Sequence, residues 1–178
     1  MRKLEVTMFM SLDGVMEEPV WTAPYWKDEI AKFKLDELLA SDALLLGRVT
    51  YQGFANAWPS RTDDIGFADR MNRLPKYVVS TTLENPTWNN STLIKENVAG
   101  EIIKLKQQRG QAIMVAGSVK LIQTLLQENL IDEYRLLIYP VILGKGRRLF
   151  PEGSKTTLKL LEAKTFHSGV VLVRYAPL

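Results

Sequence analysis

The sequence contains no cysteine and a single histidine among its 178 residues. Without cysteine the chain has no thiol nucleophile, no disulfide bridge and no cysteine-based zinc site. The single histidine, His167, stands in a predicted turn with no evident acidic partner, which is typical of a surface residue and gives no support for a Ser-His-Asp triad. We therefore expect no metal site and no thiol or triad catalysis.

Long apolar segments are also missing. The longest nearly unbroken apolar run covers residues 136–143 and contains Pro140, whereas a membrane span needs about 20 apolar residues. Charged residues stand at positions 2, 3 and 5, where the apolar part of a signal peptide would begin. We therefore expect no membrane segment, no export signal and a cytoplasmic location.

Blocks of like charge are equally scarce. The 23 Lys and Arg residues are scattered, the formal net charge is +3, and only Lys145, Arg147 and Arg148 form a tight basic cluster. This cluster fits either an exposed basic turn or a contact to a substrate phosphate. No base-contacting motif accompanies it. We therefore expect a small-molecule ligand and no nucleic-acid partner.

The composition is that of one globular domain over residues 1–178. The chain is 46% hydrophobic and 24% charged, and at this length it can bury a sizeable core without disulfides or metal. Its eight prolines and eleven glycines fall singly between periodic segments, with no repeat, linker or low-complexity stretch.

Strand and helix patterns alternate along the chain, which predicts an α/β fold with a mostly parallel sheet and helices on both faces. Residues 43–46 are continuously apolar and end at a glycine, as in a strand buried on both faces. Two C-terminal strands joined by residues 167–169 predict an antiparallel hairpin, so the sheet is mixed. We expect strands over residues 3–10, 43–46, 77–79, 112–116, 132–143, 157–166 and 170–175, helices over residues 25–40 and 98–108, helices beginning at residues 47 and 117, and a polar, mobile stretch over residues 59–73.

Three predicted strands end in residues that bind anions. The sequence Gly47-Arg48-Val49-Thr50 follows one strand, Gly117-Ser118 follows another, and Ser80-Thr81-Thr82 follows a third. A glycine lets the backbone approach a phosphate, and a helix N-terminus offers unpaired N–H groups to it. Gly and Ser are also ordinary turn and cap residues, but three such ends at one sheet edge favour a ligand with several phosphates. Neither GxGxxG nor GxxxxGK[ST] is present, so the usual Rossmann and P-loop fingerprints do not apply.

These residues resemble the dihydrofolate reductase-like superfamily over nearly the whole chain. The segments that carry the resemblance are Met10-Ser11-Leu12-Asp13-Gly14, Leu44-Leu45-Leu46-Gly47-Arg48-Val49-Thr50-Tyr51, Lys76-Tyr77-Val78-Val79-Ser80 and Met114-Val115-Ala116-Gly117-Ser118. Within the superfamily, residues 130–150 are most similar to the reductase domain of riboflavin biosynthesis, the RibD C-terminal domain. The resemblance implies an NADPH-dependent reductase of a pterin-like or aminopyrimidine ring.

By motif position the resemblance also implies a cofactor site. The implied cofactor residues are Gly47, Arg48 and Thr50 on the adenosine side, Ser80 and Thr81 near the 2′-phosphate together with Arg48, and Gly117, Ser118 and Val119 at the pyrophosphate. Because Arg48 and the two hydroxyls satisfy the extra phosphate, we expect NADPH to bind more tightly than NADH.

The implied substrate residues follow the first strand. Asp13 lies in the loop that the riboflavin reductases place beside the reacting rings, where a carboxylate can orient a ring or relay a proton. The Asp13-Gly14 pair also fits an ordinary turn. The aromatic residues Trp21, Tyr25 and Trp26 follow this loop and could form a stacking wall for a flat ring, although burial in the core is the commoner reason for such aromatics. Asp28 is the next acidic candidate.

Departures from the pattern leave the substrate open. The buried acid that dihydrofolate reductases carry in their first helix has no clear counterpart among Asp28, Glu29, Asp36 and Glu37, and the threonine of their long strand is missing. The deaminase half of the riboflavin enzyme needs a His/Cys zinc site, which a chain without cysteine cannot supply. We therefore expect a reductase alone, and the resemblance implies that it is most similar to the 5-amino-6-(5-phosphoribosylamino)uracil type.

The alternatives are a dihydrofolate or dihydropterin reductase and a non-catalytic NADPH- or ligand-binding domain of the same fold. We also expect a homodimer, because the riboflavin reductases commonly pair and residues 136–143 are apolar on both faces. A wholly buried central strand is the other explanation of that apolar segment.

Overall fold

All eight strands of the protein belong to one sheet in the order β4-β3-β2-β5-β1-β6-β8-β7. The computed structural model describes residues 1–178. Six of the strands are joined by parallel pairings, and β8 pairs antiparallel with both β6 and β7. The predicted mixed, mostly parallel sheet with a C-terminal antiparallel hairpin is confirmed.

The helices and strands alternate along the chain as the sequence pattern predicts. The strands are β1 (Leu4–Ser11), β2 (Ser41–Gly47), β3 (Lys76–Val79), β4 (Ser91–Ile94), β5 (Ala112–Val115), β6 (Glu133–Tyr139), β7 (Leu158–Thr165) and β8 (Val171–Pro177). The helices are the 3-10 helix η1 (Pro19–Tyr25) and the α-helices α1 (Asp28–Leu39), α2 (Arg48–Ala57), α3 (Phe67–Arg73), α4 (Val98–Gln107) and α5 (Val119–Gln127).

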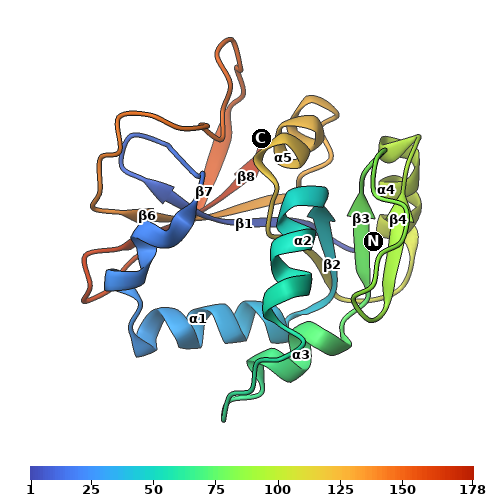
Figure 1. Cartoon of the computed structure of the whole chain (residues 1–178). Helices are drawn as coiled ribbons and strands as arrows, with labels where there is room; N and C mark the ends of the chain where they lie inside the picture. Colours follow the sequence, from blue (N-terminus) through green and yellow to red (C-terminus); the bar gives the residue numbers. More distant parts are fainter.

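Helices cover both faces of the sheet (Figure 1). On one face α4 and α5 pack on β1, β2, β5 and β6 in a core of 19 buried residues. On the other face α1, α2 and α3 pack on two smaller cores. Strand β2 contributes Leu45 to the first face and Leu44 and Leu46 to the second, which explains its continuously apolar sequence.

Strand β6 is shorter than predicted because it ends at Tyr139 rather than at residue 143. Pro140 follows directly and has no N–H to donate to a neighbouring strand. Ile142, which the pattern placed inside the strand, is 72% exposed. Strand β6 pairs with both β1 and β8, and its buried residues Leu136 and Leu137 face opposite cores. Its apolar faces are therefore covered within the chain, so its composition no longer argues for a dimer interface at this strand.

Three short elements differ from the sequence prediction. Helix α3 occupies the end of the stretch that we expected to be mobile, and the Asp63 carboxylate accepts from the amides of Phe67 and Ala68 at its start. Hydrogen bonding to these amides lowers the pKa of Asp63. Strand β4 and η1 were not predicted, because β4 is a short edge strand with mostly polar or partly exposed residues and a 3-10 helix leaves little periodicity. None of the helices has the length and apolar character needed to cross a membrane.

Candidate functional site

The carboxyl ends of β2 and β5 meet at two glycines. The Gly47 amide donates to the Gly117 carbonyl across 2.9 Å. A Cβ on Gly47 would collide with the side chain of Ser118, and a Cβ on Gly117 would lie 2.6 Å from Thr50 Oγ1. Gly117 also has φ of 126°, which L-residues rarely adopt. The structure therefore brings Gly47, Thr50, Gly117 and Ser118 into one junction in which neither glycine has room for a side chain.

Helix α5 begins at this junction. Ser118 is its N-cap, and the Ser118 hydroxyl accepts from the amide of Leu121 across 3.4 Å. Val119 is the first residue of the helix and is buried. Since the first amides of a helix have no partner within it, this end presents free N–H groups and the positive end of the helix dipole. An anionic group at the junction would be stabilised by both.

The 2′-phosphate candidates lie at the neighbouring strand ends. Gly47 is in register with Val79 of β3, so Arg48 and Ser80 each follow directly after one of these paired residues. Arg48 is exposed and its guanidinium donates to Gln52 across 3.1 Å. Ser80 is buried, and its hydroxyl accepts from the amides two and three residues further on, whereas Thr81 is exposed. Ser80 therefore shapes the turn, and Thr81 presents its side chain to solvent.

Asp13 joins the loops that follow β1 and β6. Its carboxylate accepts from Ser11 Oγ across 2.6 Å and from the amides of Leu143 and Gly144 across 3.1 and 2.8 Å. These hydrogen bonds, the one from Ser11 foremost, lower the pKa of Asp13 from 3.8 to about 2. The side chain is therefore ionised at neutral pH. That state suits a carboxylate that orients a ring or holds a loop, and it does not suit a proton donor.

The same two loops pair further along. Val15 forms an antiparallel bridge with Arg148, and the Met16 amide donates to the Arg147 carbonyl across 3.0 Å. Glu17 pairs with the Arg147 guanidinium across 3.0 Å. The basic cluster of the sequence is thus tied to the Asp13 loop, and Arg147 and Arg148 both help to hold the loop pairing.

Trp21 and Trp26 lie on a cluster of aromatic side chains at the ends of β1 and β6. The rings of Phe9, Trp21 and Tyr25 each contact the ring of Tyr139 edge-on, with centroids 5.5–5.8 Å apart. Trp26 contacts Phe9 in the same manner and is 42% exposed. The sequence indicated the three aromatics of residues 21–26, but Phe9 and Tyr139 were not singled out because each stands among other apolar residues of its strand.

Asp28 does not join this cluster. It lies in the first turn of α1, where it is exposed, and the helix buries Ile30 at that level. The buried acid of α1 is Glu37, which accepts from Thr7 Oγ1 across 2.9 Å and from Lys34 Nζ across 2.5 Å. Glu37 is one of the four acids named from the sequence, but the helical pattern alone does not show which of them faces the sheet.

His167 has an acidic partner, contrary to the sequence analysis. Its ring Nδ1 lies 3.0 Å from Glu29 Oε1, and its amide donates to Glu29 Oε2 across 3.0 Å. These two hydrogen bonds lower the pKa of Glu29. The His167 side chain is nevertheless 96% exposed, so the pair fastens the β7–β8 turn to α1 at the surface. Glu29 and His167 are 138 residues apart in the chain, so their contact could not be predicted from the sequence.

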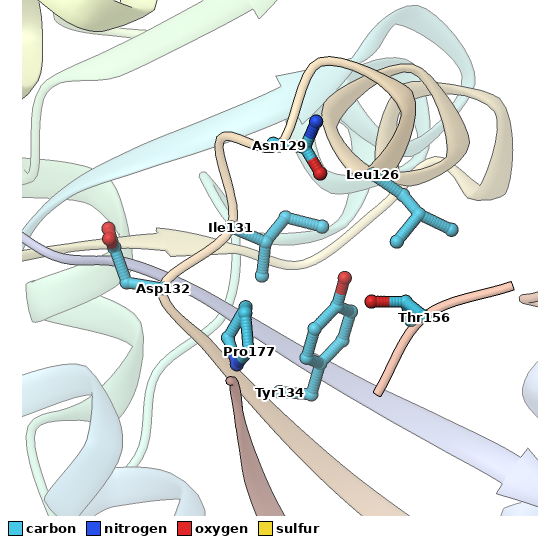
Figure 2. Close-up of a pocket in the computed structure, with 7 residues that line it drawn as sticks. All are labelled: Leu126, Asn129, Ile131, Asp132, Tyr134, Thr156 and Pro177. Carbon is cyan, nitrogen blue, oxygen red and sulfur yellow. The ribbon is translucent and has the colours of Figure 1, made fainter. Parts of the chain in front are cut away.

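A separate cavity of about 270 Å³ lies at the opposite end of β6. Its lining residues are Leu126, Asn129, Ile131, Asp132, Tyr134, Thr156 and Pro177 (Figure 2). Tyr134 and Asp132 stand at the start of β6 or just before it, whereas the glycine junction and Asp13 lie at carboxyl ends of strands. We therefore keep this cavity apart from the candidate site, whose position agrees with the usual place of ligands in open α/β sheets.

Comparison with known proteins identifies relatives over the whole chain. The RibD C-terminal domain matches residues 2–172. The uncharacterized protein YyaP of Bacillus subtilis (strain 168) is 30% identical over 178 residues, which cover 98% of this chain and 94% of YyaP.

Solved structures share the fold. A protein from Shewanella sp. PV-4 assigned to riboflavin biosynthesis has a TM-score of 0.79 at 21% identity and covers 99% of both chains. A deaminase and 5-amino-6-(5-phosphoribosylamino)uracil reductase from Thermotoga maritima has a TM-score of 0.67 at 17% identity, covering 99% of this chain and 57% of that one. Dihydrofolate reductase from Enterococcus faecalis, complexed with NADP(H), has a TM-score of 0.65 at 12% identity, covering 98% and 96%.

Proposed function

The chain belongs to the RibD C-terminal domain family, and on that basis we propose that it is an NADPH-dependent reductase of a heterocyclic small molecule. The substrate type that we propose is 5-amino-6-(5-phosphoribosylamino)uracil, which the name of the Thermotoga maritima neighbour contains. The observation that carries the proposal is the junction of Gly47, Thr50, Gly117 and Ser118, because it combines close backbone access with a helix N-terminus.

The residues present fit a dinucleotide phosphate. Gly117 and the first amides of α5 would hold the pyrophosphate, because a Cβ at residue 117 has no room and the amides of Val119 and Lys120 have no partner within the helix. Gly47 and Thr50 would lie on the adenosine side. Arg48 and Thr81 would hold the 2′-phosphate, and Ser80 would position the turn that carries Thr81.

The bound cofactor would supply the hydride, and the chain would supply orientation and electrostatics. The ionised Asp13 would accept from an N–H group of the substrate ring or hold the Leu143–Gly144 loop against it. Trp21 and Trp26 would form apolar walls for a flat ring. Asp28 is exposed, so we retain it only as the acid to test if Asp13 has no effect.

Turnover tests this proposal directly. We expect NADPH absorbance to fall when the protein is mixed with 5-amino-6-(5-phosphoribosylamino)uracil, and to fall more slowly with dihydrofolate or a dihydropterin. Faster oxidation with dihydrofolate would instead establish the folate alternative. Tight NADPH binding with no oxidation by any of these compounds would contradict a reductase.

One observation favours a non-catalytic NADPH- or ligand-binding domain as the second candidate. Asp13, the acid nearest the proposed ring site in the sequence motif, has a lowered pKa, and the buried acid Glu37 is paired with Lys34. The Asp13 carboxylate is therefore not poised to donate a proton at neutral pH, and Glu37 is held in an ion pair. A domain that binds NADPH without turnover would show these features as well.

We also propose that the protein is a homodimer. The edge strand β7 exposes Leu160 and Leu161, and an edge strand offers unpaired backbone groups to a second copy. The proposed interface therefore moves from β6 to β7. Light scattering at micromolar concentration should give the dimer mass, and a monomer mass would exclude the pairing.

A further inference from the structure

Tyr139 carries a polar group that the fold leaves without a partner. The residue is 0% exposed, and its hydroxyl is buried with no hydrogen-bond partner. A buried polar group without a partner is destabilising, so proteins rarely keep one that has no use. Phenylalanine would fill the same space among the same neighbours at no such cost. The hydroxyl is therefore a feature that stability alone does not explain.

The Tyr139 ring lies among aromatic and aliphatic side chains. Phe9, Trp21 and Tyr25 each present a ring edge-on to the Tyr139 ring, and Ile30 and Leu137 belong to the same core. Burial raises the pKa of Tyr139 to about 12, so the hydroxyl keeps its proton and remains a donor at physiological pH. A group that used this donor would be an acceptor that tolerates an apolar environment.

The place of Tyr139 in the sheet links it to the proposed ring site. It is the last residue of β6 and is in register with Ser11, the last residue of β1. Ser11 donates to Asp13, so the tyrosine lies at the base of the Asp13 loop. It is also at the carboxyl edge of the sheet, where the glycine junction lies.

The residues that cover Tyr139 belong to a short, locally held segment. Trp21 and Tyr25 both belong to η1. The side-chain hydrogen bonds of η1 are local, from Trp21 Nε1 to the Glu17 carbonyl and from Thr22 Oγ1 to the Pro19 carbonyl. Moving Tyr25 aside would therefore uncover one edge contact of the Tyr139 ring without breaking a strand pairing or either of these hydrogen bonds.

We propose that Tyr139 is a specificity-determining residue whose hydroxyl donates a hydrogen bond to a carbonyl oxygen or ring nitrogen of a flat, uncharged heterocycle that takes the place of Tyr25. This inference rests on the proposed function, since it assigns a recognition group to the ring site of that reductase. A site with a buried donor rejects rings that lack an acceptor, because the donor would again be unpaired.

The test removes only the hydroxyl. The variant is Tyr139→Phe, and the matched control is Tyr134→Phe, because Tyr134 is also a buried tyrosine of β6, its pKa is likewise raised to about 12, and it lies at the other end of the strand on the other face. The probes are pterin and 5,6-diaminouracil, titrated against tryptophan fluorescence with and without NADPH. Ribose 5-phosphate, which has no flat heteroaromatic ring, is the negative probe.

We expect at least one ring probe to bind the wild type and its affinity to fall about tenfold or more in Tyr139→Phe. The same affinity should be unchanged in Tyr134→Phe. The thermal midpoint of Tyr139→Phe should be equal to or above that of the wild type, since the change removes an unsatisfied group. If the hydroxyl had a purely structural role, its removal would lower the midpoint and leave probe affinity unchanged.

Unchanged probe affinity in Tyr139→Phe would overturn the inference, and so would the absence of ring binding by the wild type. Failure of the proposed function has a different signature, because it would appear as absent NADPH binding in the wild type. Ring binding without NADPH remains measurable in that case, so the two failures are distinguishable.

Discussion

The two halves of the candidate site are built from different parts of the chain. At the ends of β2 and β5, backbone geometry defines the site, since Gly47 and Gly117 leave no room for side chains and Ser118 caps α5. At the ends of β1 and β6, side chains fill the space, with Trp21 and Tyr25 packed on Tyr139. On the proposed function the first half would accept a ligand as it stands, whereas the second would have to rearrange to admit one. Substitutions in one half should therefore affect cofactor affinity without affecting ring binding, and substitutions in the other half should do the reverse.

The largest expected effect comes from Gly117→Val. Its Cβ would stand 2.6 Å from Thr50 Oγ1 at φ of 126°, where the backbone must approach a pyrophosphate. We expect NADPH affinity to fall about 100-fold or more, because the charge-assisted hydrogen bonds to the backbone are lost. Isothermal titration measures this loss, and circular dichroism checks that the fold is retained.

Gly66→Val is the matched control for that variant. Gly66 also has positive φ, at 80°, but nothing lies within 4 Å of its Cβ position. Both variants incur backbone strain of about 1–3 kcal/mol, and only the change at residue 117 should affect NADPH. Equal losses of affinity in the two variants would mean that strain, rather than the junction, is responsible.

Asp13→Asn should produce the opposite result. The change keeps the size of the side chain but removes the charge that accepts from Leu143 and Gly144. We expect NADPH affinity to stay and turnover to fall roughly 100-fold with a substrate that the wild type reduces. Steady-state kinetics together with NADPH titration separate the two effects. If turnover is unaffected, the acid lies elsewhere and Asp28 is the next residue to replace.

A smaller effect is expected from pH. The pKa of Asp13 is lowered from 3.8 to about 2 in the folded state, so its stabilising contribution is fully present above about pH 4 and is lost as pH falls toward 2. The thermal midpoint of the wild type should therefore exceed that of Asp13→Asn above pH 4, and the difference should shrink between pH 4 and 2. A constant difference across this range would show that the carboxylate charge is not involved.

Sequence reasoning found the backbone-defined half more completely than the other. Glycines at strand ends and the residues after them are local signals, so Gly47, Gly117 and Ser118 could be selected before their contact was known. The aromatic half depends on which residues face each other across the sheet. Tyr139 looked like one more apolar position in a strand, and its missing hydrogen-bond partner is visible only in three dimensions.

The same distinction explains the errors in the fold and around the site. Pro140 indicates the end of β6 at Tyr139, but the apolar residues that continue to residue 143 led to the prediction of a longer strand. The Glu29–His167 pair joins residues far apart in the chain, and the choice of Glu37 among four acids of α1 required the facing residues Thr7 and Lys34. Local chemistry is readable from sequence, whereas partners across the sheet are not.

The most direct test of the account compares NADPH and NADH binding to the wild type and to Arg48→Gln by isothermal titration, with Arg73→Gln as the control because Arg73 is an exposed arginine of another helix. The account predicts that the wild type binds NADPH at least about tenfold more tightly than NADH, since a hydrogen bond to a charged group contributes about 1.5–3 kcal/mol. Arg48→Gln should lose most of that preference and Arg73→Gln should retain it. Equal affinities of the wild type for the two cofactors would contradict the account.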